Sequence, residues 1–298
     1  LSCVSVPLFL AHVITAISRI EDRPLNKQPT LAFIGAGNMA RAIIGGLIDN
    51  GYPAEQIWAT EPTTAKLTDL AIQGVKTSDN NSEAVACADI VVLSVKPQIL
   101  KSVCDEIVDA VQTQQPLIVS IAAGIMSPTI DQWLGTSNAI VRCMPNTPAL
   151  VQTGASGLYA NTFVSDEQRQ QAEEILAAIG IALWVDEESQ LDAVTAVSGS
   201  GPAYYFLMME SMIEAGKKLG LSEDVATQLT LQTALGAAKM ASSSDVDPGE
   251  LRRRVTSPNG TTEQAIKRFI DGGLPELVDT ALKACNDRSV ELAKELDQ

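Results

Sequence analysis

A glycine-rich turn near the beginning of the chain has the spacing of a dinucleotide-binding loop. Residues 31–40 read LAFIGAGNMA, an apolar run that ends in Gly35, Gly37 and Ala40 with the pattern G-x-G-x-x-A. The first glycine permits a tight turn, the second lets the backbone approach phosphates, and the small third residue lets a helix pack on a strand. The free N–H groups of that helix would face a pyrophosphate. The motif also fits a turn that binds nothing, but its place between a strand and a helix favours a cofactor.

A second stretch whose residues could bind a ligand is found at residues 255–266, which read VTSPNGTTEQAI. Ser257 and the Pro-Asn-Gly that follows predict a turn, and Thr261 and Thr262 stand at the entrance of a helix. Free backbone N–H groups, the helix dipole and two hydroxyls at one place favour a carboxylate. The alternative is an ordinary helix start with an N-cap and with Glu263 in its first turn.

The only histidine of the sequence is His12, close to its beginning. A Ser-His-Asp or Cys-His mechanism, or a metal held by histidine, therefore has no histidine to use in the rest of the chain. The five cysteines are odd in number and form no C-x-x-C pair, so reduced thiols are expected rather than disulfides or zinc. We expect no metal site.

The segments that must position these motifs alternate between strand and helix. Apolar runs predict strands from residue 31 and at residues 57–60, 88–95, 116–121 and 139–143, with helices at 41–49, 65–73 and 99–112. Residues 154–160, a helix near 166–179 and residues 181–185 complete this part. Continuous apolar strands between helices indicate a parallel sheet that is covered on both faces. Breaks follow four of the strands and should line one crevice: Gly35, Lys96-Pro97, Ala123-Gly124 and Pro145-Asn146.

After about residue 190 only helices are expected, at residues 200–219, from Ser222, at 263–269 and at 275–296. The first of these helices is apolar on nearly every side, and such a surface has to be buried. Packing against a second copy of the chain is one explanation. The other is that Met208, Met209 and Met212 belong to the core of a single chain.

Composition limits the partners of this 298-residue chain, which has a formal net charge of −15. Nucleic acid needs a face of Lys and Arg, so it is not an expected partner, whereas a small anion can bind where local N–H groups oppose the overall field. Residues 1–30 are expected to be a leader outside the fold. Their apolar part is too short and too interrupted to span a membrane, and the alternative interpretation is a membrane-associating helix.

The stretch VTSPNGTTEQAI resembles the signature of the Δ1-pyrroline-5-carboxylate reductases, which complete proline synthesis. The segments FIGAGNMA, VLSVKPQ, VSIAAGI, VRCMPNTPAL and AVSGSGPAYYF also occur in the order and spacing of that family. The resemblance covers about residues 31 to 295 and leaves only the leader outside. It implies reduction of 1-pyrroline-5-carboxylate to L-proline with NADPH or NADH, the last step of proline biosynthesis. The reduced thiols expected of the cysteines favour the cytoplasm as the location.

The resemblance implies an α/β fold with a Rossmann dinucleotide-binding domain at residues 31–189. A helical dimerisation and substrate-binding domain follows at residues 190–298. Two chains of the family intertwine, dimers often assemble into a larger ring, and each active site lies between a cofactor crevice and a helical domain. Neither a nucleic acid nor a membrane is an expected partner.

The resemblance also assigns site residues. The residues expected to hold the cofactor are Ile34, Gly35, Ala36, Gly37, Asn38, Met39, Thr60, Glu61, Asn81, Ser94, Val95, Lys96, Pro97, Ile121, Ala122 and Ala123. Those expected to hold the substrate are Ser257, Gly260, Thr261, Thr262 and Asn146, the last in a Met-Pro-Asn loop near the nicotinamide. Thr262 is the expected catalytic residue, with its hydroxyl beside the ring nitrogen.

Two positions depart from the pattern of the family. Glu61 stands where some relatives have Ser or Thr for a 2′-phosphate, and an acidic residue there ordinarily accepts ribose hydroxyls, which favours NADH. NADPH stays open because the neighbouring side chains could still accommodate it: Thr60, Thr63, Thr64 and Lys66. Arg254 stands where some relatives have Asn near the cofactor, and it is either a cation for the phosphates or an ordinary surface charge.

Reduction of a cyclic imine needs a hydride on the C=N carbon and a proton on nitrogen, and an iminium is electrophilic without help from a metal or histidine. We expect the N–H groups of Gly260 and Thr261 to hold the carboxylate while Thr262 orients or relays the proton. One alternative is a 3-hydroxy acid reductase, for which the first lysine of the long helix, Lys217, is badly placed. The other is a cofactor-binding regulator without turnover.

Overall fold

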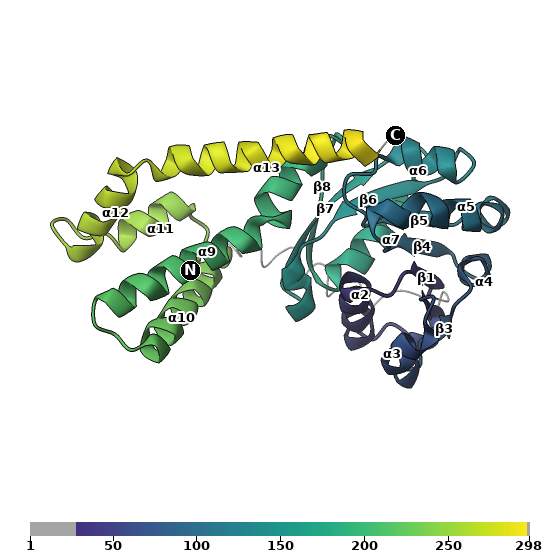
Figure 1. Cartoon of the computed structure of the whole chain (residues 1–298), viewed down its shortest axis with the longest axis horizontal. Helices are drawn as coiled ribbons and strands as arrows, with labels where there is room; N and C mark the ends of the chain where they lie inside the picture. Colours follow the sequence, from purple (N-terminus) through teal and green to yellow (C-terminus); the bar gives the residue numbers. More distant parts are fainter. Residues whose placement is uncertain (1–27, 297–298) are drawn as a thin grey trace, which may run out of the picture. The chain divides into compact units, whose positions relative to one another are not determined.

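The computed structural model describes residues 28–296, which form two compact units (Figure 1). The sheet unit comprises residues 28–202 and 281–296, and the helical unit comprises residues 203–280. The leader is expected at residues 1–30, and residues 1–27 of it lie outside the described residues. Thr30 is buried, and its N–H donates to the Asp89 carboxylate at 2.7 Å. The domain boundary expected between residues 189 and 190 stays a prediction.

The sheet unit is built on eight strands in the order β3-β2-β1-β4-β5-β6-β7-β8. Their bounds are β1 Leu31–Ile34, β2 Ile57–Thr60, β3 Lys76–Ser78, β4 Ile90–Leu93, β5 Leu117–Ser120, β6 Ile140–Met144, β7 Gly154–Ala160 and β8 Gly180–Trp184. Neighbouring strands are parallel, as the sequence predicts, except that β7 runs antiparallel to β6. The connection between these two strands holds only a 3₁₀ turn at Thr147–Val151, which is too short for the crossover that a parallel pair needs.

Helices cover both faces of the sheet, as Figure 1 shows. In β1, Leu31 and Phe33 join the core on one face and Ala32 and Ile34 the core on the other, which is the alternation of a strand buried on both sides. Helices α2 and α7 pack on the first face and α4, α5 and α6 on the second. The helices of this unit are α2 Asn38–Asp49, α3 Thr68–Ile72, α4 Asn81–Ala86, α5 Pro97–Gln114, α6 Ser127–Trp133, α7 Asp166–Ala177 and α8 Gln190–Val194. The helix expected at residues 65–73 is a 3₁₀ turn at Thr64–Leu67 followed by the short α3.

The chain continues from α8 into a π-helical turn at Thr195–Gly199 and then into helices only, which confirms the all-helical prediction. These are α9 Gly201–Lys218, α10 Glu223–Ser242, α11 Pro248–Arg254, α12 Thr261–Asp271 and α13 Leu274–Leu296. Residues 281–296 of α13 belong to the sheet unit. Met208 and Met212 are 39% and 46% exposed, so they do not form the core of a single chain. No helix within residues 28–296 combines the length and apolar character needed to cross a membrane.

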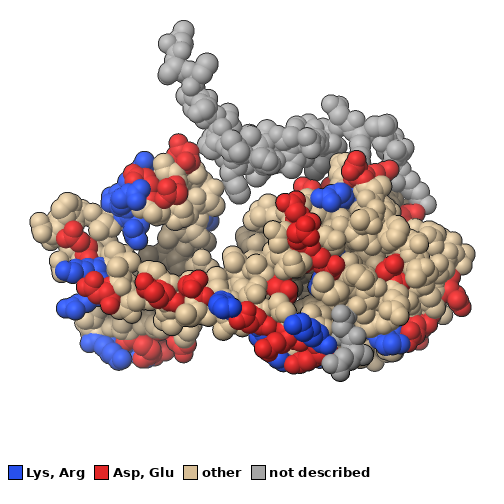
Figure 2. All heavy atoms as spheres, turned by 90° about the horizontal axis from the view of Figure 1, so that it is seen from above, with Lys and Arg blue, Asp and Glu red and all other residues tan. Residues whose placement is uncertain are grey.

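Charged side chains of opposite sign lie next to one another on the face seen in Figure 2. Among the described residues, ion pairs within one helix include Lys101–Asp105 on α5 and Arg288–Glu295 on α13. These exposed pairs contribute little to stability. The acidic excess of the sequence is therefore partly offset locally by neighbouring cations.

We predict that Cys104 and Cys143 resist alkylation in the folded protein. Both thiols are buried in the sheet unit, and burial raises the pKa of each to about 12, so the reactive thiolate is scarce even at pH 9. Iodoacetamide at pH 8 should label the exposed Cys87 in the native protein and all three cysteines in urea, as read by peptide mass spectrometry. Native labelling of Cys143 as fast as Cys87 would contradict this placement of β6.

Candidate functional site

The glycine turn has the conformation that its sequence predicts. Gly35 has a φ of +92°, which disfavours any residue with a side chain. A Cβ there would also lie only 2.7 Å from Val95 Cγ1, so there is no space for one. Gly37 is the N-cap of α2, is exposed, and a Cβ on it would meet nothing within 4 Å. No side chain caps this helix, so its first N–H groups face open space. A pyrophosphate fits this arrangement, because the dipole and free donors favour an anion at a place with room for one.

The parallel strands bring several of the expected cofactor residues together at their carboxyl ends. The Ser94 hydroxyl, after β4, donates to the Gly35 carbonyl at 2.6 Å. The Gly35 N–H donates to Thr60 Oγ1 at 3.4 Å, and that hydroxyl, at the end of β2, donates to Asn81 Oδ1 at 2.6 Å. Asn81, the first residue of α4, in turn donates to Glu106 at 3.0 Å. The turn, the second strand and the adenosine-side residue therefore form one hydrogen-bonded group.

The remaining cofactor-side segments follow β4, β5 and β6. Lys96 is the exposed N-cap of α5, which begins at Pro97. Residues 121–123 follow β5, and residues 145–146 follow β6, whose last residue is Met144. The Asn146 side chain is buried and already bonded, since Oδ1 accepts the Ala155 N–H at 2.9 Å and Nδ2 donates to the Ser198 carbonyl at 3.0 Å. Its expected contact with the substrate stays a prediction, and in this structure the amide holds the loop in place.

Glu61, directly after β2, forms an ion pair with Lys66. The distance between Lys66 Nζ and Glu61 Oε1 is 3.1 Å, and the two side chains are 65% and 22% exposed. The carboxylate that disfavours a 2′-phosphate therefore stands beside a cation that attracts one. This pairing keeps both cofactors open at the position where the sequence favours NADH.

Arg41 contacts the glycine turn and is not among the residues that the sequence analysis assigns to the site. Its Nε donates to the carbonyl of Ala36 at 2.9 Å, while its other nitrogens bond to the Lys66 carbonyl and to Asp69. One side chain thus fastens the glycine turn to the segment after β2. The available signal was an arginine in the first turn of α2, where the helix dipole disfavours a cation unless it has another task.

The turn before α12 belongs to the helical unit. Asn259 is left-handed with a φ of +57°, and the Gly260 N–H donates to the Ser257 carbonyl at 3.0 Å. Gly260 is the N-cap, so Thr261 and Thr262 are the first two residues of α12, and both are exposed. Glu263 accepts the Asn259 N–H at 2.8 Å, and no side chain caps the helix. The turn is therefore an ordinary structural element whose helix end is also open to an anion.

Arg254 lies on α11 and pairs with Glu250. Its Nε is 3.0 Å from Glu250 Oε1, and Arg253 bonds to the other oxygen of the same carboxylate at 2.8 Å. Its side chain is 57% exposed. These contacts fit the interpretation of Arg254 as a surface charge, and a role near the cofactor stays a prediction.

Comparisons with known proteins decide the family. The family model described as pyrroline-5-carboxylate reductase dimerisation matches residues 188–292, and one described as NADP oxidoreductase coenzyme F420-dependent matches residues 30–124. The pyrroline-5-carboxylate reductase of Pseudomonas aeruginosa is 59% identical over 271 residues, which cover 91% of this chain and 99% of that protein. The chain belongs to the pyrroline-5-carboxylate reductase family.

Solved structures of the family agree with this fold. The enzyme from Coxiella burnetii matches with a TM-score of 0.87 and 46% identity, over 89% of this chain and 98% of that one. The enzyme from Plasmodium falciparum, solved with NADP bound, matches with a TM-score of 0.79 and 30% identity, over 90% and 99%. Family membership thus rests on nearly the whole length of the described chain.

We predict that Arg41→Met weakens binding of NADPH and NADH by about tenfold, the value of one or two hydrogen bonds to a charged group. Arg41→Lys should recover only part of the loss, because an ammonium cannot reach the three acceptors at once. Titration by quenching of protein fluorescence measures the affinity. Lys101→Met, which breaks an exposed ion pair on α5, is the matched control and should bind as the unchanged protein does. Equal affinities for all four proteins would show that Arg41 does not position the turn.

Proposed function

We propose that the protein reduces 1-pyrroline-5-carboxylate to L-proline with NADPH or NADH, the last step of proline biosynthesis. The observation that carries this conclusion is the 59% identity to a pyrroline-5-carboxylate reductase over 99% of that enzyme's length. The protein is thus an NAD(P)H-dependent oxidoreductase that acts on a carbon–nitrogen double bond. The open N-terminus of α2 after the glycine turn supports the cofactor half of this function.

The cofactor would lie along the carboxyl ends of the strands, with its pyrophosphate on the N–H groups of residues 35–39. Thr60, Glu61 and Asn81 would hold the adenosine side, and residues 94–97 and 121–123 the rest. When bound, NAD(P)H supplies a hydride from C4 of its nicotinamide. The protein contributes alignment and charge complementarity, which suffice for an electrophilic iminium.

On the substrate side, the first N–H groups of α12 would hold the carboxylate, with the hydroxyl of Ser257 beside them. Thr262 would orient the ring nitrogen or relay its proton. The support for these roles is the exposed start of α12 at Thr261 and Thr262, which no side chain caps. The Gly260 N–H already donates to the Ser257 carbonyl, so it would have to exchange this bond for one to the substrate. No histidine occurs between Gln28 and Leu296, and this division of tasks needs none.

The chain forms a homo-oligomer through the region that matches the dimerisation model, residues 188–292. Large apolar side chains stay exposed on its helices in the single chain, which supports a partner surface: Tyr205, Phe206, Leu207, Met212, Leu229, Leu235, Phe269 and Leu277. A dimer, its assembly into a larger ring, and a cytoplasmic location are parts of the same proposal.

An absorbance assay tests the function directly. Purified protein is mixed with 1-pyrroline-5-carboxylate and either NADPH or NADH, and the loss of reduced nicotinamide and the formation of proline are followed. Turnover with at least one cofactor is expected. Binding of cofactor without turnover would favour a regulator, and turnover of 3-hydroxy acids instead would favour a different reductase.

We predict that Thr262→Ala lowers kcat roughly ten- to a thousandfold, the range for loss of one donor to a transition state. Thr262→Ser keeps the hydroxyl and should retain most of the activity. Steady-state kinetics at saturating cofactor measure both, and thermal melts exclude a folding defect. An alanine variant with full activity would remove Thr262 from the mechanism.

We predict that Glu61→Ser shifts the preference towards NADPH by roughly fivefold, because one carboxylate near a 2′-phosphate costs about 1 kcal/mol at a partly exposed site. The change also frees Lys66 from its ion pair. Dissociation constants for NADPH and NADH, measured on the same preparations, give the ratio. An unchanged ratio would exclude Glu61 as the determinant of cofactor choice.

A further inference from the structure

A buried ion pair stands behind the last two strand ends of the crevice. Arg142 Nη1 on β6 lies 2.9 Å from Glu188 Oε1, and the two side chains are only 9% and 11% exposed. Burying two charges is expensive, and such a pair is kept only where further hydrogen bonds satisfy it. Glu188 makes such hydrogen bonds. Its carboxylate accepts one from the Ser127 N–H at 2.6 Å and one from the Ser127 hydroxyl at 2.8 Å.

These bonds act on the loops that follow β5 and β6. Ser127 begins α6, so Glu188 fixes the end of the segment 121–126 that comes after β5. Arg142 Nη1 also lies 3.3 Å from the sulfur of Met126, the last residue of that segment. Arg142 itself is two residues before Met144, the end of β6, from which residues 145–146 lead away. One ion pair therefore fixes both loops to each other.

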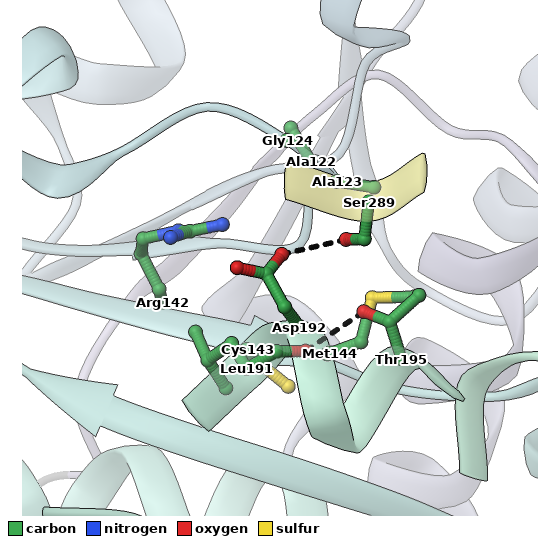
Figure 3. Close-up of a pocket in the computed structure, with 10 residues that line it drawn as sticks. All are labelled: Ala122, Ala123, Gly124, Arg142, Cys143, Met144, Leu191, Asp192, Thr195 and Ser289. Carbon is green, nitrogen blue, oxygen red and sulfur yellow. Dashed lines mark hydrogen bonds between the residues drawn. The ribbon is translucent and has the colours of Figure 1, made fainter. Parts of the chain in front are cut away.

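Figure 3 shows a small pocket that Arg142 lines together with residues of the two loops. A pocket of about 10 Å³, room for one water molecule, is lined by loop residues 122–124 and Met144 on the crevice side. Arg142 and Asp192 line it as well, and Asp192 accepts a 2.6 Å hydrogen bond from Ser289 on α13. The two loops are thus supported from behind by charged side chains and are not packed on apolar groups alone.

The strand order tells which part of a dinucleotide these loops would meet. With the pyrophosphate at the end of β1 and the acidic Glu61 at the end of β2, the adenosine half extends towards β2 and β3. The other half must then run in the opposite direction, over the ends of β4, β5 and β6. The loops held by Arg142 and Glu188 belong to that second half.

We propose that Arg142 and Glu188 are positioning residues for the nicotinamide half of the cofactor. They touch neither the cofactor nor the substrate, and they act by holding the loops after β5 and β6 in register with each other. The proposal rests on the proposed function only in that NADPH or NADH is the ligand. A merely structural ion pair would affect stability and the binding of every ligand alike.

The test separates the two halves of the cofactor. For Arg142→Met and Glu188→Gln, affinities for NADPH and NADH are compared with affinities for 2′,5′-ADP and ADP, which lack the nicotinamide. We expect about a tenfold loss for the whole cofactors, the value of a charged hydrogen bond, and less than about a twofold loss for the fragments. Equal losses for cofactors and fragments would overturn the proposal. Turnover of the unchanged protein tests the proposed function separately.

A double variant distinguishes positioning from stability. Arg142→Met with Glu188→Leu leaves no lone buried charge, so its melting temperature should exceed that of Arg142→Met. Its affinity for the whole cofactors should stay low, because leucine cannot accept the two hydrogen bonds of Ser127. Affinity that recovers together with the melting temperature would overturn the proposal. Lys101→Met with Asp105→Leu, an exposed pair on α5, is the matched control and should change neither.

Discussion

The close approach of the Gly35 backbone to the end of β4 determines where the other groups at this edge of the sheet can lie. Its positive φ and the 2.7 Å distance of a hypothetical Cβ from Val95 leave room for no side chain. The contact lets the Ser94 hydroxyl donate to the Gly35 carbonyl and sets the direction in which α2 departs. If the turn lay further from β4, its hydrogen bond from Ser94 would be lost. The open start of α2 is therefore a consequence of packing between two strand ends.

Local sequence patterns predict many of the strands and helices of the fold. The strand at residues 57–60 has the bounds that its apolar run indicates, and α12 begins at the threonines that the turn residues point to. Short or polar elements are not predicted from the sequence. Examples are β3, which consists of Lys76, Thr77 and Ser78, and α6, which has seven residues. A three-residue polar strand is stabilised by its neighbour in the sheet, and no periodicity within it can reveal that. The antiparallel β7 likewise depends on a connection length and not on composition.

Charged residues were harder to interpret than glycines. Arg41 and Glu188 gain their roles from partners 25 and 46 residues away, so their own neighbourhoods give little indication of them. Asn146 is the opposite case. Its motif predicts a contact with the substrate, which stays a prediction, and in the folded chain its amide bonds to Ala155 and Ser198. A polar residue beside a crevice can face the ligand or hold the wall, and only the tertiary contacts distinguish the two.

The binding of anions by this acidic chain also depends on which side chains are already paired. A chain with a formal charge of −15 binds an anionic dinucleotide and an anionic acid only if favourable groups are local. Three of the cations named above are paired, Arg41 with Asp69, Lys66 with Glu61 and Arg254 with Glu250, so each adds little net charge. Oriented backbone N–H groups then supply much of the attraction, and their field weakens within one helical turn. Binding by such short-range dipoles depends on the exact height and tilt of each loop. This dependence gives a physical reason for the buried ion pair of Arg142 and Glu188, which is costly in free energy but holds the loops after β5 and β6 in place.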